Sequence, residues 1–346
     1  MSGSNATTPS LKERLGFTGG AAALRVRFFG VIGFLVALIV IFTTMSDRFL
    51  TGDNWRSILF SAAILMVIAA SQAIVVLTGN LDLSVGSIMG LVAYVVYDIG
   101  GMNEAFGPFA IPFGLLIGLV LGAINGYLVA YLEIPSIVAT LGTLSVYRGF
   151  VSFYANAQQV TVEELPRYMR DLAQATWLGL PAYVWVAIAV VLLVALVLRR
   201  TPWGRQVYAY GSNPKAAYFF GLNSRRIILQ AYAVSGMVAA FGGLLLGAQI
   251  GNINSLLANG WEMQALAAVV IGGVSIWGGS GSVIGAAIGA IVLATINNGL
   301  VLLHVQEFYR LLIQGTAIIV AVGVDAIVQR KVLSATTRRR IMEVEQ

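Results

Sequence analysis

Long apolar runs, separated by short polar connections, dominate this sequence from residue 28 onward. A helix needs about 20 consecutive apolar residues to cross the hydrocarbon core of a bilayer, and most of the runs approach that length. Of the 346 residues, 58% are hydrophobic and only 10% are charged, whereas a soluble domain is about half apolar and a quarter charged. The runs lack the alternation that is typical of outer-membrane β-strands. The sequence therefore predicts an all-α polytopic membrane protein.

We predict about ten transmembrane helices in one membrane domain, residues 27–330, flanked by tails at residues 1–26 and 331–346. The predicted spans are residues 28–45, 57–78, 84–97, 107–131, 134–153, 182–198, 228–250, 263–277, 282–303 and 309–328. Lysine and arginine are concentrated in the two tails and in the 199–226 connection. The positive-inside rule then places both termini and this connection in the cytoplasm. No small-residue cleavage site follows the first run, so we expect a retained span.

The chain resembles itself when it is shifted by about 172 residues. Gly79-Asn80-Leu81-Asp82 then falls on Gly251-Asn252-Ile253-Asn254, and Ile124-Asn125-Gly126 falls on Ile296-Asn297-Asn298. Spans two to five and seven to ten are therefore predicted to be two repeats of inverted orientation. The third and eighth spans occupy equivalent places, contain glycine and have about 14 and 15 residues. Short, glycine-interrupted spans in corresponding places indicate a transport site.

Two acidic residues lie beside these short spans, where an ionisable group is costly. Asp82 is predicted to cap the helix that follows it, with its carboxylate accepting from the amide of Ser84 or Val85. It either caps only, or it also lines a water-accessible pathway or its inner gate. Glu262, before the eighth span, has the same two interpretations.

The 199–226 connection contains a predicted short helix. Asn213 suits its N-cap, Pro214 its first turn and Gly221 its C-terminal stop. Tyr218, Phe219 and Phe220 follow one another near its end, and three aromatic residues on so short a helix should not face bulk water. They either pack against this protein's own membrane face or enter a groove of a partner, and we favour the partner.

Several function classes lack the residues that they need. The sequence has no cysteine and one histidine, His304, so we predict no metal site and no catalytic residue. It has no G-x-x-x-x-G-K-[ST] loop, so we expect no ATP hydrolysis by this chain. The basic residues, which give a net charge of +6, form no aromatic-interleaved motif for nucleic acid.

Four segments resemble the ribose-type permease subunits of bacterial ABC sugar importers: "NLDLSVGSIMGL" (80–91), "IPSIVATLGTLSVYRG" (134–149), "TPWGRQVYAYGSNPKAA" (201–217) and "GGVSIWGGSGSVIGAAIGAI" (272–291). The branch that looks closest carries rhamnose or the autoinducer-2 signal. The resemblance implies a bacterial inner-membrane protein in membrane lipid. Its partners would be a second permease, identical or paralogous, a cytoplasmic ATPase that carries ATP and Mg, and a periplasmic binding protein that delivers a neutral sugar.

The resemblance also implies residue roles. The segment that docks on the ATPase in the family corresponds to Gly211, Asn213, Ala216, Ala217 and Gly221. Here Tyr218, Phe219 and Phe220 stand where the family often has polar residues, so the groove on the ATPase would be more apolar. Asn80 stands where glycine is common, which adds an amide at the gate.

A neutral polyol requires hydrogen-bonding groups and no charge. The candidates in or beside spans are Ser84, Asn125, Thr140, Thr143, Gln264, Asn297 and Asn298, each of which could instead link two helices. The outer segment 162–177 is predicted to form an interfacial helix or a plug near the binding protein. Its charged residues either face solvent, which we favour, or contact the binding protein; they are Glu163, Glu164, Arg167, Arg170 and Asp171. The alternative function is an ion- or proton-coupled sugar carrier, although the acidic residues lie mainly at span ends. A membrane-embedded enzyme is the third alternative and lacks catalytic groups.

Overall fold

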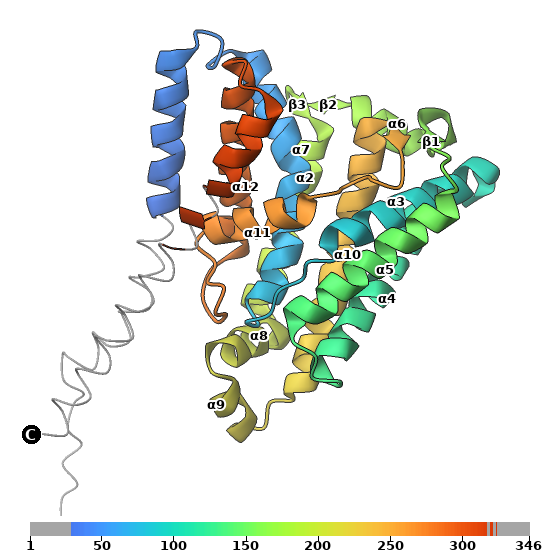
Figure 1. Cartoon of the computed structure of the whole chain (residues 1–346), viewed down its shortest axis with the longest axis vertical. Helices are drawn as coiled ribbons and strands as arrows, with labels where there is room; N and C mark the ends of the chain where they lie inside the picture. Colours follow the sequence, from blue (N-terminus) through green and yellow to red (C-terminus); the bar gives the residue numbers. More distant parts are fainter. Residues whose placement is uncertain (1–28, 317–318, 321–322, 324–346) are drawn as a thin grey trace, which may run out of the picture.

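A computed structural model describes residues 29–316, 319–320 and 323. The predicted tails, 1–26 and 331–346, lie outside the described residues, as does the end of the tenth predicted span. The described chain is predominantly helical, as predicted (Figure 1). The long helices are α2 (Gly52–Val76), α3 (Val85–Met102), α4 (Ala110–Ala130), α5 (Ser136–Ala155), α7 (Ala182–Arg200), α10 (Ser224–Ile250) and α12 (Val283–Leu302).

Shorter elements join the long helices. They are η1 (Glu104–Phe109), η2 (Val162–Glu164), α6 (Arg167–Gln174), α8 (Pro202–Ser212), α9 (Pro214–Phe219), α11 (Trp261–Ile271), and four two-residue strands, β1 (Val160–Thr161), β2 (Thr176–Trp177), β3 (Leu180–Pro181) and β4 (Asn252–Ile253). β1 pairs antiparallel with β4, and β2 with β3. A further helix begins at residue 307 and continues through residue 316.

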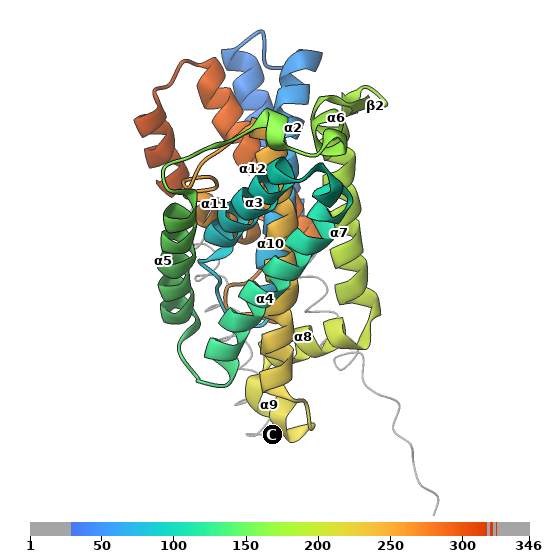
Figure 2. The same cartoon turned by 90° about the vertical axis from the view of Figure 1, so that its right-hand side faces the viewer.

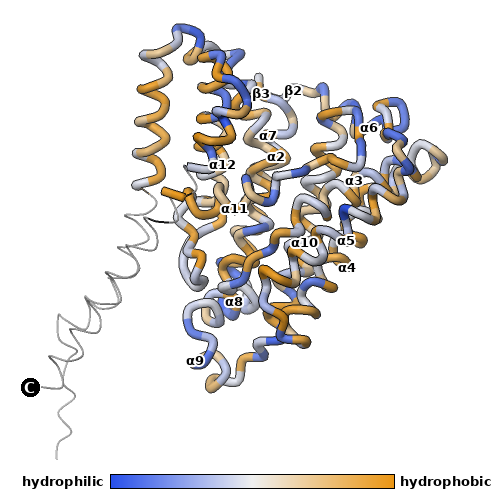
Figure 3. Tube along the Cα trace, in the orientation of Figure 1, coloured by the Kyte–Doolittle hydropathy of each residue, from blue (hydrophilic) through white to orange (hydrophobic). Residues whose placement is uncertain are grey.

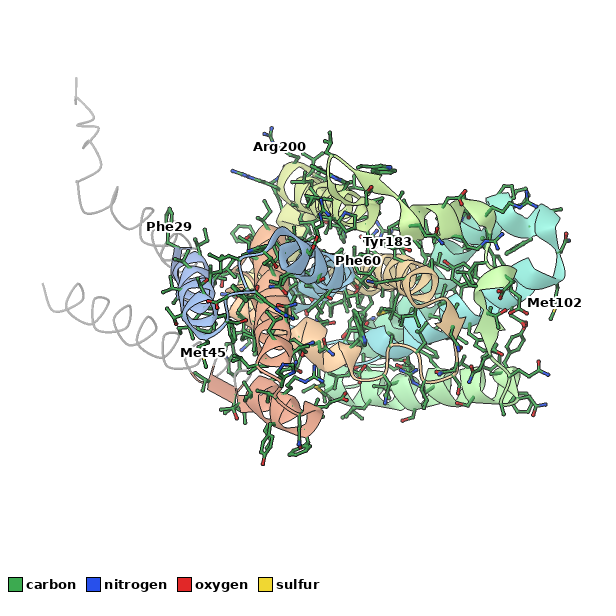
Figure 4. All side chains as sticks on the ribbon, turned by 90° about the horizontal axis from the view of Figure 1, so that it is seen from above. Phe29, Met45, Phe60, Met102, Tyr183 and Arg200 are labelled. Atoms are coloured by element: carbon green, nitrogen blue, oxygen red, sulfur yellow. The ribbon has the colours of Figure 1, made fainter. Side chains whose placement is uncertain are left out.

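Seven described helices are long and apolar enough to cross a membrane, and Phe29–Met45 and α11 are shorter apolar helices. These nine elements and the helix from residue 307 coincide with the ten predicted spans, although the number that cross a membrane stays a prediction. Hydrophobic residues cover the long helices, and hydrophilic ones gather at connections such as those beside α6 and β3 (Figure 3). The view from above places Phe60 of α2 beside Tyr183 of α7, with ring centroids 5.7 Å apart (Figure 4).

The expected lengths of the third and eighth spans need correction. α3 has 18 residues rather than about 14, because it continues through Gly100 and Gly101, whose missing side chains let the 164–166 segment pack against them. α11 is shorter than expected, with 11 residues. It ends in a Schellman arrangement in which Gly273 has φ +79° and the Val274 amide donates to Val269 O at 3.1 Å. Of the third and eighth spans, both within the described residues, only the eighth is therefore interrupted.

The helix bounds repeat at the offset found in the sequence. Adding 172 to the bounds of α2 gives 224–248, against 224–250 for α10, and adding it to those of α4 gives 282–302, against 283–302 for α12. The loop details repeat as well. Ser84 donates its amide to Asp82 Oδ1, and Leu256 donates its amide to Asn254 Oδ1, each at 2.9 Å. α2 and α10 run in opposite directions (Figure 1), as inverted repeats require.

α10 lies at the centre and packs against α4, α2 and α3. Figure 2 shows α4 crossing it. The crossing depends on glycine: a Cβ at Gly118 would overlap Gly236 O, and a Cβ at Gly122 would overlap Tyr232 O. The backbones can therefore approach closely, as in small-residue packing of transmembrane helices. The outer faces of α4 and α5 carry many exposed apolar side chains, which suit contact with lipid.

Candidate functional site

A hydrogen-bonded network surrounds the buried start of α3. Asp82 Oδ1 accepts from the Ser84 amide at 2.9 Å and from Ser84 Oγ at 2.7 Å. Ser84 Oγ in turn accepts from Asn125 Nδ2 of α4 at 2.7 Å. Tyr147 of α5 donates to Leu121 O at 3.0 Å and lies 3.4 Å from Asn125 Oδ1. Asp82, Ser84 and Asn125 are completely buried, so this network links α3, α4 and α5.

The predicted bond between Asp82 and the Ser84 amide is confirmed, but Ser84 is the N-cap residue of α3. The reason is local: the carboxylate closes a two-residue turn ahead of the helix, and so it reaches only the Ser84 amide. Among the described residues, Asp82 Oδ2 has no hydrogen-bond partner although it is buried. An orphaned buried oxygen is costly.

Replacing Ser84 by alanine is expected to destabilise the fold by about 1–2 kcal/mol, because the change leaves Asn125 Nδ2 without its acceptor and Asp82 without a hydroxyl donor. The readout is the thermal unfolding midpoint of the detergent-solubilised protein. Ser145→Ala is the matched control, since Ser145 is exposed and donates only to Leu141 O of its own helix. Equal midpoints for the two variants would contradict the network.

Glu262 lies in the first turn of α11 against the first turn of α3, where a Cβ at Gly86 would overlap its Oε2. This oxygen is also buried without a hydrogen-bond partner among the described residues. One turn along α3, Gly90 faces Arg148 of α5, which donates to Ser255 O at 3.1 Å and to Leu257 O at 2.8 Å. Two glycines thus bring the start of α11 and the segment before it onto α3.

Two of the predicted polar residues meet in a separate cleft. Gln264 of α11 and Asn297 of α12 line it together with Ser61 of α2 and Gln314. Its volume of about 60 Å³ admits a few water molecules and is below the roughly 300–1,000 Å³ of typical ligand pockets. Arg310 also donates to Asn297 Oδ1 at 3.3 Å. Amide and hydroxyl side chains therefore share this cleft with the apolar residues Leu65, Ala267, Leu293 and Ala294.

Of the other predicted pathway residues, Asn80, Thr140 and Thr143 form hydrogen bonds with nearby residues of the chain. Thr140 donates to Ser136 O at 2.8 Å and Thr143 to Thr140 O at 3.3 Å, both within α5. Asn80 donates to Thr78 Oγ1 at 2.9 Å. Asn298 Oδ1 is buried and has no partner in the described part of the chain. The ten predicted pathway residues therefore do not converge on one site in this conformation.

The predicted short helix is α9, with the expected caps. Asn213 Oδ1 accepts from the Ala216 amide at 3.0 Å, and Pro214 occupies the first turn. Gly221 has φ +76°, and the Leu222 amide donates to Ala217 O at 3.0 Å, which completes a Schellman stop. The helix α8 before it was not predicted.

Some residues of the 211–221 segment, which contains α9, are exposed and others are buried. Tyr218, Phe219 and Phe220 are 72%, 85% and 86% exposed. The alternative in which they pack on the protein's own membrane face is therefore wrong for this structure. Gly211 and Ala217 are buried, so they are not available to a docking partner. α9 projects at one end of the molecule beside α8 and the start of α10 (Figures 1 and 2).

Comparison with known proteins identifies the chain's relatives. Residues 54–322 match the family described as the branched-chain amino acid transport system/permease component. The chain belongs to this permease family. The autoinducer 2 import system permease protein LsrC of Salmonella typhi is 36% identical over 82% of the permease and 81% of the relative. The LsrC proteins of Photorhabdus luminescens and Escherichia coli are 37% and 36% identical, over 84% of the permease and 88% and 85% of the relatives. No solved structure matches.

This membership confirms the resemblance to ABC-type permeases that the motifs indicated, and it makes the permease a transporter subunit rather than an enzyme. Sequence reasoning missed Tyr147, which connects Asn125 to α5, and Arg148, which ties α5 to the backbone of the segment before α11. It also missed Gln72, which is fully buried in α2 with both side-chain polar atoms unpaired within the described structure. A buried amide in an apolar span was the available signal.

Proposed function

We propose that the permease is the transmembrane subunit of an ATP-driven importer in the bacterial inner membrane, with both termini in the cytoplasm. ATP and Mg would be held by a separate ATPase subunit, because this sequence has no phosphate-binding loop. The observation that carries the proposal is the exposed aromatic end of α9 in a chain whose relatives are import permeases. Such a projection requires a partner with an apolar groove.

α9 is the proposed docking helix. Tyr218, Phe219 and Phe220 enter the groove of the ATPase, while Asn213 and Gly221 fix the ends of the helix that presents them. Ala216 lies at the half-buried surface of the helix, and Ala217 packs it onto the rest of the permease. Closure of the ATPase on ATP would move α9 and, with it, the spans.

The cleft between α2, α11 and α12 is the proposed start of the pathway. Its polar lining of Ser61, Gln264, Asn297 and Gln314 would be unfavourable against lipid. A second permease, identical or paralogous, covers it in our proposal, and the pathway runs between the two subunits. Asn80, Asp82, Ser84, Asn125 and Glu262 then belong to a gate region at the starts of α3 and α11. Thr140, Thr143 and Asn298 are assigned to the polar surroundings of this region.

The outer surface offers a place for a binding protein. Glu163, Glu164, Arg167, Arg170 and Asp171 line one open pocket of about 500 Å³ between the end of α3 and α6. Acidic and basic side chains are both present in this pocket. Such a mixture orients a docking protein more than it strengthens the binding.

The cargo in this proposal is a small neutral polyol, such as a monosaccharide or the autoinducer-2 signal that the relatives are named for. The polar groups of the cleft are amides and a hydroxyl, which match hydroxyl groups without demanding a charge. Selection among such molecules would fall mainly to the binding protein.

Uptake into proteoliposomes that contain the permease with its co-purified ATPase and binding protein is expected to depend on ATP. We expect ribose, rhamnose or autoinducer-2 to accumulate at least about tenfold with ATP over a non-hydrolysable analogue. Collapse of the proton gradient should leave uptake unchanged. Uptake that follows the proton gradient and ignores ATP would instead establish the secondary carrier.

A further inference from the structure

Three segments that are far apart in the sequence meet directly behind α9. They are the loop after α2 (Leu77–Gly79), the end of α8 (Gly211–Ser212) and the loop before α12 (Trp277–Gly281). We call this contact the glycine junction. It matters because the three segments lead to different parts of the molecule: the first to the Asp82 network, the second to α9 and the third to the cleft helix α12.

The contacts in the glycine junction are made by backbone atoms. The Gly279 amide donates to Leu77 O at 2.9 Å. A Cβ at Gly211 would overlap Leu77 O and come within 2.7 Å of Gly279 N. A Cβ at Gly278 would come within 2.7 Å of Gly79 N and 3.0 Å of Gly211 O. Any side chain at Gly211 or Gly278 would therefore push the segments apart.

One side chain adds a second link between the same segments. Tyr208, one helical turn before Gly211 in α8, donates its hydroxyl to Gly281 O at 3.1 Å. α8 is thus held to the loop before α12 at two successive turns. Backbone atoms in direct contact cannot change rotamer as packed side chains can, and a hydrogen bond also fixes their direction. The three segments of the glycine junction therefore have little room to move independently of one another.

We propose that the glycine junction transmits movement of α9 to α3 and α12 together, and that Gly211 is a positioning residue for coupling rather than part of the surface that docks on the ATPase. The proposal rests on the proposed function. Gly211 is buried against Leu77 and Gly279, whereas the aromatic residues of α9 face outward. Docking on the ATPase and transmission of its movement to the spans are therefore carried out by different residues of the 211–221 segment.

The absence of cysteine from the sequence permits a direct test. Asn80, in the loop after α2, is replaced by cysteine in the permease–ATPase complex, and its labelling by a membrane-impermeant maleimide is timed without nucleotide and with ATP plus vanadate. We expect the nucleotide to change the labelling rate at least about fivefold. With Gly211→Ala added, this change should fall below about 1.5-fold, while ATP hydrolysis and co-purification of the ATPase stay within twofold.

Two further variants keep the test decisive. Gly142→Ala is the control, because a Cβ at Gly142 has no atom within 4 Å, and it should preserve the full response. If Gly211→Ala does not accumulate in the membrane, Tyr208→Phe is tested in its place. We expect this variant to lose at least half of the nucleotide-dependent change in labelling rate. A full response in Gly211→Ala, or in Tyr208→Phe when that variant decides, overturns the inference. A parent complex with no ATPase or no nucleotide response would overturn the proposed function first.

Discussion

Replacement of Gly122 by leucine is expected to prevent the permease from folding. A Cβ at this position would overlap Tyr232 O and lie 3.0 Å from Tyr232 C and 3.1 Å from Ala233 Cα. All three atoms belong to the backbone of α10, which cannot turn aside as a flexible side chain can. The cost should exceed the roughly 1–3 kcal/mol that is typical of overpacked side-chain cores, because the whole α4–α10 crossing must separate.

The measurement is the amount of monodisperse protein in size-exclusion chromatography after mild solubilisation, together with the thermal midpoint of whatever remains. We expect a loss of at least 90% of the monodisperse peak. Gly142→Leu supplies the comparison, since a Cβ at this position on α5 has no atom within 4 Å. A Gly122→Leu peak as large as that of the control would show that the crossing can relax.

Local features of this fold could be predicted well from the sequence. Asn213, Pro214 and Gly221 define α9 through interactions that span only a few residues, and the structure has each in its expected place. The spans follow from hydropathy for the same reason: burial in lipid is decided residue by residue. The repeat could also be found, because equivalent turns need the same small or polar residues, such as Gly79 and Gly251 with φ near +78° and +70°.

Features that depend on distant parts of the chain could not be predicted. The end of α3 depends on the 164–166 segment, which packs on Gly100 and Gly101, and no periodicity within α3 reports that contact. The predicted polar residues also fall into separate groups in the structure, and their spacing in the sequence does not indicate these groups. Ser84 and Asn125 meet in one network, Gln264 and Asn297 meet in one cleft, and Thr140 and Thr143 bond within α5.

The glycine junction belongs to the same category. Gly211 was predicted to act in coupling from a resemblance that concerns one continuous segment. The structure buries it against residues from two other loops. A glycine in the sequence indicates either an unusual backbone conformation or the close approach of another segment. Only the folded structure shows which segment approaches it.

Replacement of Phe219 and Phe220 by aspartate together is expected to separate the permease from its ATPase without unfolding it. Both side chains are more than 80% exposed, so the folded permease loses little packing when they change: Phe219 gives up an edge contact with the Tyr218 ring, whose centroid is 6.0 Å away. Buried aromatic anchors are worth at least about 2 kcal/mol each at interfaces, and two charges in an apolar groove add a desolvation penalty. We expect at least a 100-fold weaker interaction, measured as ATPase retained on the tagged permease and as ATP-driven uptake.

The matched variant Phe219→Leu with Phe220→Leu keeps apolar side chains and removes only the rings, so it should bind within about tenfold of the parent. The thermal midpoint of both double variants should stay within the range of the parent, because surface changes away from packed groups are usually worth less than about 0.5 kcal/mol. Undiminished co-purification of the ATPase with the aspartate variant would mean that α9 is not the docking helix. Loss of uptake with intact co-purification would instead place these rings in transmission, beside Gly211, and not in docking.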